Sequence, residues 1–238
     1  MNVCIYRIPR GKSIVTPPSA CPECDEKIRP WQNIPVVSFL LLKGRCNNCK
    51  TKISVRYPLV ELLTGFLTVI VYYWFGINFE GLAALFLLYY LVAVVFIDID
   101  FRIIPDRIIL AGLITGVIIH VAGNFMSWKE ILVGGLIGSG FLLFTFFLGK
   151  LLFKKESVGG GDIKFGFMLG IFLGTQNIIV GLFISYVFAA LIGGGGKILQ
   201  GRAPTGEIPF GPYLALGSAT ALFFGDDIAA GYFAWVGF

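Results

Sequence analysis

The segment LAALFLLYYLVAVVFID, residues Leu82 to Asp98, determines which kind of fold this chain can adopt. It carries no charged residue before its last position. In lipid, a segment of this kind is stable only as a helix, because a helix pairs its own backbone polar groups. We therefore predict a membrane-spanning helix that ends in an acid.

Similar apolar segments occupy most of the chain on both sides of this one. Apolar residues make up 56% of the 238 residues and charged residues 14%, which is unusual for a soluble domain. Several segments are shorter than the ~20 residues that cross a bilayer alone. We expect an all-α polytopic membrane protein of about seven transmembrane helices, at residues 58–75, 82–98, 108–122, 131–148, 163–173, 178–192 and 209–224.

The first 56 residues differ from the rest, because they hold ten of the 19 Lys and Arg residues. The sequence thus predicts a small polar domain at residues 1–56 and a membrane domain at residues 57–238. No basic helix or base-stacking aromatic motif accompanies the net charge of +5, so nucleic acid is not an expected partner.

The positive charges also predict the topology. If the first domain is cytoplasmic and seven spans alternate, only Lys129 lies outside. Such a bias is typical of multi-pass membrane proteins, whose cytoplasmic loops are rich in Lys and Arg. The other positive charges after residue 56 then lie at the cytoplasmic side: Arg102, Arg107, Lys150, Lys154, Lys155, Lys164, Lys197 and Arg202.

Four cysteines in the first domain form two C-x2-C pairs, Cys21 with Cys24 and Cys46 with Cys49. Two such turns present four thiolates tetrahedrally, the usual ligands of a structural Zn²⁺. Disulfides are disfavoured in the cytoplasm, and a segment this small needs a metal to fold. We predict a zinc-ribbon-like domain. Cys4 is a lone thiol and is expected to have a packing role.

Two acids stand out at the membrane edge. Asp98 ends the second predicted span, where an acid is costly unless it is hydrated or paired. Asp162 follows three glycines and starts the fifth predicted span. Asp162 could simply cap that helix, and Asp100 and Asp106 could be solvated loop acids.

The predicted topology brings Asp98 and Asp162 to the same side of the membrane. Two carboxylates held close together cannot both ionise easily, so one keeps a proton. The charged member can activate water while the neutral member polarises a scissile carbonyl. The pattern indicates an aspartic peptidase that needs no catalytic metal.

Other peptidase classes fit poorly. His120 is the only histidine, which excludes a zinc site with two histidines. A serine peptidase would have to combine His120 with Ser139, but no Gly-x-Ser-x-Gly turn is present.

Several motifs, taken in order, resemble the type IV prepilin peptidases, which are bifunctional leader peptidases and N-methyltransferases of bacteria. The resemblance extends from Asn2 to about Gly225 and includes both cysteine pairs. Its other elements are NVCIYRIP (2–9), NIPV (33–36), RYPLVE (56–61), the acid run ending in IPD (104–106), the Gly-x-Gly-Asp turn (159–162) and IPFGPYLA (208–215).

The resemblance implies cleavage of prepilin or pseudopilin precursors after a glycine, at the cytoplasmic membrane face. It also implies methylation of the new amino terminus with S-adenosylmethionine. Carried over by position, the catalytic pair falls on Asp98 and Asp162. Asn2 and Glu61 are candidates for the methyltransferase. The expected supporting residues are Asp100, Asp106, Gly159, Gly161 and Lys164.

One feature departs from the family pattern. Relatives normally begin with a further apolar helix, which is associated with the methyltransferase, whereas this sequence starts at Met1-Asn2. Two alternatives stay open: a related Gly-x-Gly-Asp intramembrane protease without methyltransferase activity, and a non-enzymatic zinc-ribbon assembly protein. A transporter would predict internal repeats and acids near mid-bilayer, which this sequence lacks.

Overall fold

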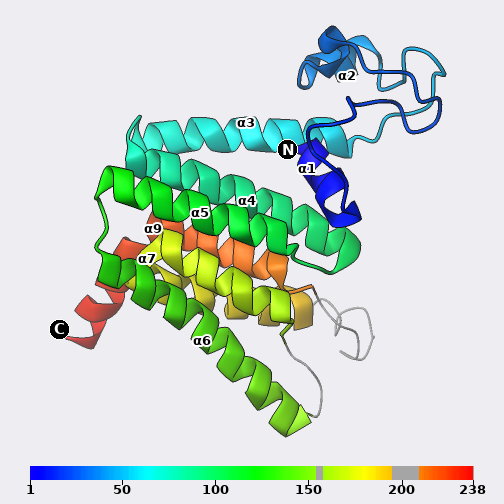
Figure 1. Ribbon diagram of the computed structural model, residues 1–238. Coiled ribbons are helices and arrows are strands. Elements are labelled where there is room, and N and C mark those ends of the chain that lie inside the picture. The colour runs from blue at the N-terminus through cyan, green and yellow to red at the C-terminus, as the bar shows by residue number, and fades with distance from the viewer. Residues whose placement is uncertain (154–157, 195–208, 238) are drawn as a thin grey trace. The chain divides into compact units, whose positions relative to one another are not determined.

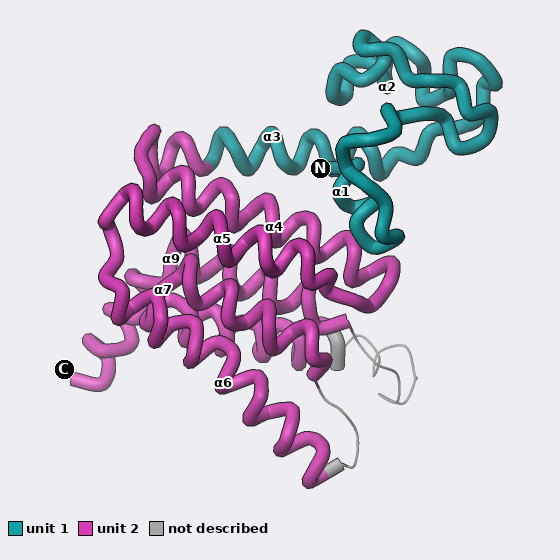
Figure 2. Tube along the Cα trace, viewed as in Figure 1, with its two compact units in different colours: residues 1–70 teal, residues 71–238 magenta. Residues whose placement is uncertain are grey.

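The computed structural model describes residues 1–153, 158–194 and 209–237 (Figure 1). Within these ranges the chain is helical and contains no strand, only two isolated β-bridges. It divides into two compact units, Met1–Ile70 and Val71–Phe238 (Figure 2). The predicted cytoplasmic charges Lys154, Lys155, Lys197 and Arg202, and Ile208 of the last motif, lie outside the described residues.

Unit 1 consists of short helices and turns, followed by the start of a long helix. Both β-bridges belong to the cysteine turns, Ala20 with Lys27 and Arg45 with Lys52. Bridges this short build no sheet, so the unit has little regular structure of its own. Its elements are α1 (Asn2–Arg7), η1 (Ile8–Arg10), η2 (Pro30–Asn33), α2 (Val37–Leu41) and the first part of α3 (Arg56–Phe75).

Unit 2 is a bundle of long apolar helices, and the all-α membrane fold is confirmed. Among the described residues, five helices, α3 to α7, are long and apolar enough to cross a membrane, and the first part of α3 belongs to unit 1. Helix α9 contains Asp226 and Asp227 and is not among the five, so its crossing stays a prediction. The elements of unit 2 after α3 are α4 (Phe79–Phe101), α5 (Asp106–Gly123), α6 (Trp128–Phe153), α7 (Gly160–Phe188), η3 (Ala189–Gly194) and α9 (Gly211–Val236).

The predicted spans fall on these helices, but most of the helices are longer than predicted. Helix α6 begins at Trp128, where Ser127 and Glu130 exchange hydrogen bonds and cap the first turn. Helix α9 continues past Phe224 to Val236. Polar residues at helix ends are tolerated because they reach the membrane surface, and hydropathy therefore marks only the apolar middle of each helix.

Helix α7 is a hairpin with two arms, residues 160–174 and 175–188. Gly174 has φ 72° and ψ −175°, which is open to glycine and breaks the helix. A Cβ placed on Gly138 of α6 would lie 2.1 Å from Gly166 O and 3.3 Å from Ile178 Cγ1. Positions 166 and 178 would be roughly 18 Å apart in a straight helix. The chain therefore reverses at Gly174. The fifth predicted span falls on the first arm and the sixth on the second arm and η3, and their crossing as two separate spans stays a prediction.

Glycines bring α6 and the first arm of α7 into backbone contact. A Cβ on Gly170 would lie 2.0 Å from Gly134 O, and one on Gly166 would lie 2.7 Å from Gly138 O. Small residues permit such close approach, and dispersion between backbones then holds helices together in lipid. This contact fixes the arm that begins at the predicted catalytic acid Asp162.

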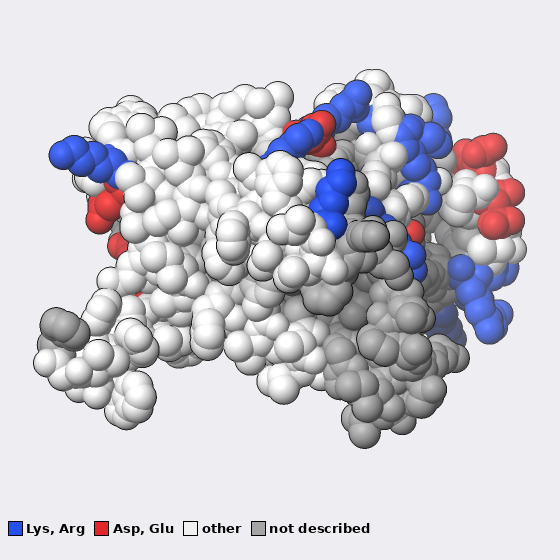
Figure 3. Space-filling model, turned by 90° about the horizontal axis from the view of Figure 1, so that it is seen from below, with Lys and Arg blue, Asp and Glu red and all other residues white. Residues whose placement is uncertain are grey.

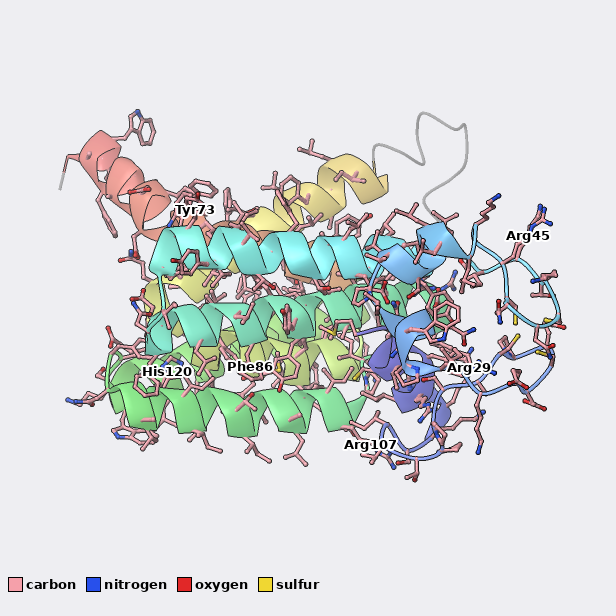
Figure 4. All side chains as sticks on the ribbon, turned by 90° about the horizontal axis from the view of Figure 1, so that it is seen from above. Arg29, Arg45, Tyr73, Phe86, Arg107 and His120 are labelled. Atoms are coloured by element: carbon pink, nitrogen blue, oxygen red, sulfur yellow. The ribbon has the colours of Figure 1, made fainter. Side chains whose placement is uncertain are left out.

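The two ends of the bundle differ in character. Arg107 lies at one end of α5 and His120 at the other (Figure 4). Trp74 and Trp128 lie at the His120 end of their helices, as expected for a membrane–water interface. Seen from below, the long helices present a broad band of uncharged side chains (Figure 3). Asp98, Asp106 and Asp162 lie toward the Arg107 end, each within or near the terminal turn of its helix.

Candidate active site and metal site

Asp98 is a buried acid near the end of α4, with 5% of its surface exposed. Three residues later the chain leaves the helix, and Arg102 adopts a left-handed conformation with φ 54°. The Arg102 backbone N–H donates to Asp98 O at 2.9 Å and closes the last turn. The side chain of Asp98 is thus held inside the bundle while the chain turns away.

The carboxylate of Asp98 accepts a hydrogen bond from the first residue of α9. The backbone N–H of Gly211 donates to Asp98 Oδ2 at 2.9 Å. A Cβ on Gly211 would lie 2.7 Å from the same oxygen, so only glycine allows this approach. Backbone amides at a helix start are unpaired within the helix and are natural donors to an anion. Gly211 therefore belongs to the site, although the sequence analysis gave it no role.

Asp162 lies in the first turn of α7. Its Oδ2 accepts the backbone N–H of Gly159 at 2.9 Å, so the acid does cap its helix. A Cβ on Gly161 would lie 3.3 Å from Ile104 Cβ, which places the start of α7 against the loop that follows Asp98. The structure therefore places the two predicted acids on neighbouring segments, Asp98 at the end of α4 and Asp162 at the start of α7.

The other predicted supporting residues divide into two groups. Lys164 Nζ lies 2.7 Å from Asp106 Oδ1 and joins the first turns of α7 and α5. This ion pair is exposed, with 58% and 73% of the side chains accessible, and it contributes little to stability. Asp100 is exposed and lies about 200° around α4 from the buried Asp98.

The serine alternative gains no support from the structure. Ser139 donates its hydroxyl to Gly135 O at 3.0 Å within α6. His120 lies near the far end of α5 and packs against Phe125, with ring centroids 4.6 Å apart. A nucleophile and its base need to be within hydrogen-bond reach, and these two side chains have other neighbours.

The four cysteines of unit 1 form a second site. Their sulfurs all lie within 4.8 Å of one another, with Cys21 Sγ 3.8 Å from Cys49 Sγ and Cys24 Sγ 4.0 Å from Cys46 Sγ. Sulfurs bound tetrahedrally at ~2.3 Å from a zinc ion are roughly 3.8 Å apart. The thiol arrangement thus has the size of a four-sulfur metal site.

Both pairs are shaped by the same backbone turn. Cys21 N donates to Glu26 O at 3.0 Å, and Cys46 N donates to Thr51 O at 2.8 Å. The residue four positions after each first cysteine, Asp25 or Lys50, has a positive φ. In each pair, this turn directs the two thiols and the neighbouring backbone amides toward the same point.

The electrostatics of the thiols suit a cation. The backbone amides of Cys49 and Asn48 lower the pKa of Cys46 to about 7. Donation from the Glu23 backbone lowers the pKa of Cys21, but burial and hydrogen bonds with neighbouring thiols raise it to about 11. The Cys46 thiolate therefore forms near neutral pH. The Cys21 thiolate forms when a bound cation offsets the repulsion between the two negative charges.

The methyltransferase candidates also lie together in unit 1. Asn2 Nδ2 lies 3.3 Å from Glu61 Oε1 and donates to Tyr57 O at 3.0 Å. Glu61 Oε2 accepts the backbone N–H of Val36 at 2.9 Å. Asn2 and Glu61 both line a cavity of about 950 Å³ that lies within this unit.

Two family models match the chain. Residues 1–75 match the bacterial peptidase A24 N-terminal domain, and residues 85–194 match the type IV leader peptidase family. The prepilin leader peptidase/N-methyltransferase of Stutzerimonas stutzeri is 40% identical over 92% of this chain and 76% of its own length. This chain belongs to the type IV leader peptidase family.

Further relatives carry the same name. The Pseudomonas aeruginosa protein is 40% identical over 95% of this chain and 78% of its own length. The Neisseria gonorrhoeae protein is 35% identical over 95% of this chain and 86% of its own length. No solved structure matches the chain. The likeness to type IV leader peptidases thus covers both units, and the sequence-based family prediction is confirmed.

Proposed function

We propose that this member of the type IV leader peptidase family cleaves the leader from prepilin-like precursors and methylates the new amino terminus. The observation that carries the proposal is the placement of the buried Asp98, at the end of α4, and of Asp162, in the first turn of α7, which packs against the loop after Asp98. Membership of an enzyme family whose members act on prepilins supports the same conclusion. The substrate is a prepilin or pseudopilin in the lipid bilayer, and cleavage follows a glycine.

The cleavage step needs only the two carboxyl groups and water. The charged carboxylate takes a proton from water, whose oxygen attacks the scissile carbonyl carbon, while the neutral carboxylic acid donates a hydrogen bond to the carbonyl oxygen. When the tetrahedral intermediate collapses, a proton passes to the leaving amine nitrogen. The Gly211 and Gly159 amides hold Asp98 and Asp162 in place during these transfers.

The proposed location is the bacterial inner membrane, with unit 1 in the cytoplasm. Support comes from the distribution of Lys and Arg, of which ten lie in residues 1–56. Cleavage would then occur at the cytoplasmic face, near Arg107. Five residues are proposed to support the site: Asp100, Asp106, Gly159, Gly161 and Lys164. The ion pair between Asp106 and Lys164 supports this assignment for those two residues.

The methylation half is proposed to reside in unit 1. S-adenosylmethionine supplies the methyl group, and the new amine acts as the nucleophile. Asn2 and Glu61 are the proposed residues for this activity, and their shared hydrogen bond at the edge of the cavity supports the assignment.

The metal of unit 1 is proposed to be a structural zinc. We expect about one Zn²⁺ per chain, and Cys21→Ser or Cys46→Ser should lower the folded yield severalfold, because ligand loss removes metal-linked folding energy. Metal analysis and yield after purification measure both quantities. Cys4→Ser is the control, since Cys4 is outside the cluster and should change neither.

Active, freshly reduced protein that contains no zinc would contradict this role. A chelator that stops cleavage at once while the fold remains intact would instead show that the metal takes part in catalysis.

Mass spectrometry of a prepilin tests the whole function. After incubation with purified protein and S-adenosylmethionine, the substrate should lose its leader and gain the mass of one methyl group. Leader loss alone would favour an intramembrane protease without methyltransferase activity. An unchanged substrate would favour a non-enzymatic assembly protein.

A further inference from the structure

Tyr186 packs against the residue that precedes Gly211, and the sequence analysis did not single it out. It belongs to the second arm of α7, near the end at which η3 begins. Its ring packs against Phe210, with centroids 5.0 Å apart. Phe210 immediately precedes Gly211, whose N–H binds Asp98.

The hydroxyl group of Tyr186 is held by a chain of hydrogen bonds. Thr145 of α6 donates its own hydroxyl hydrogen to Leu142 O at 2.9 Å. The Thr145 oxygen is therefore the acceptor, and the Tyr186 hydroxyl donates to it at 2.9 Å. Phe141 adds an edge-on ring contact with centroids 5.5 Å apart. The tyrosine ring thus has a fixed position between α6 and the start of α9.

We infer that Tyr186 is a positioning residue of the peptidase site. It holds Phe210 by its ring and α6 by its hydroxyl, and so fixes the Gly211 amide on the carboxylate of Asp98. This role rests on the proposed peptidase function. In lipid, helices gain little from hydrophobic burial against each other, so specific contacts of this kind set their spacing.

A second tyrosine–threonine pair provides a matched control. The Tyr90 hydroxyl lies 3.0 Å from Thr115 Oγ1, and Thr115 in turn donates to Ala111 O at 2.8 Å. This pair joins α4 to α5 and has the same chemistry and partial burial. The Tyr90 ring packs toward Phe172 and Phe86, away from the residues of the site.

The test compares Tyr186→Phe with Tyr90→Phe, using purified protein in detergent and a prepilin substrate. Tyr186→Phe should lower kcat about tenfold with KM changed less than about twofold, because small displacements of a reacting group mainly cost rate. Tyr90→Phe should keep kcat near that of the wild type. The two variants should unfold at similar temperatures.

Changes at Thr145 extend the comparison. Thr145→Val removes the acceptor and should match Tyr186→Phe, and the double variant should be no worse than either alone. Thr145→Ser keeps the hydroxyl group, so its kcat should be close to that of the wild type. Tyr186→Leu, which also removes the ring, should be more severe.

Equal kcat values for Tyr186→Phe and Tyr90→Phe would overturn the inference, as would an effect on KM alone. A loss of kcat that merely follows a lowered unfolding temperature would also overturn it. If wild-type protein cleaves no prepilin, the proposed function itself fails, and the role of Tyr186 fails with it.

Discussion

Asp98→Asn and Asp162→Asn are each expected to lower leader cleavage about 10³-fold or more. Asparagine keeps the size of the side chain and can still accept the backbone hydrogen bond from Gly211 or Gly159. It cannot carry the charge that activates water. Single-turnover cleavage of a prepilin measures the loss, while membrane insertion and zinc content should stay near wild type.

The double variant provides a further check on the pair. Because the two acids act as a unit, removing both should be little worse than removing one. Asp100→Asn is the control, since Asp100 is exposed on another side of α4 and should keep most of the activity. Near-normal cleavage by either Asp98→Asn or Asp162→Asn would show that the pair is misassigned.

Gly211→Ala is expected to lower cleavage about 100-fold, since an acid displaced by about 1 Å can cost that much in rate. The added Cβ would lie 2.7 Å from Asp98 Oδ2, so the carboxylate or the start of α9 has to move. The loss should appear in kcat, because the substitution displaces a reacting group and removes no known substrate contact.

Gly231→Ala is the matched control for this prediction. Gly231 is also in α9, and a Cβ placed there meets nothing within 4 Å. Alanine is the better helix former, so this variant should be as stable as wild type or slightly more so, with unchanged cleavage. Equal activity of Gly211→Ala and Gly231→Ala would mean that the Gly211 amide has no role in positioning Asp98.

The parts of the site that the sequence predicted are those that carry their own chemical signal. The spacing of the cysteine pairs predicted four thiols at one point, and their sulfurs do lie within 4.8 Å of one another. Asp98 and Asp162 interrupt apolar segments, and alternation of the spans placed both acids at one membrane face. Both predictions needed only the residue types and their spacing or the number of spans between them.

Gly211 and Tyr186 were not predicted, because their roles depend on tertiary packing. Gly211 is 113 positions from Asp98 and contributes only a backbone N–H, which every residue except proline has. A tyrosine in an apolar segment resembles any other interfacial aromatic residue. The PFGP motif could have raised suspicion, since a glycine between bulky residues often marks close approach.

Because of the turn at Gly174, the peptidase site should be sensitive to the thickness of the membrane. At 1.5 Å per residue, the first arm of α7 rises only roughly 20 Å, whereas the hydrocarbon layer is about 30 Å thick. The bilayer must thin beside this arm, or the turn must lie below the surface, covered by Met126 and Gly134. Lipids with longer acyl chains would increase that mismatch, and the strain would fall on the short helix that begins beside Asp162.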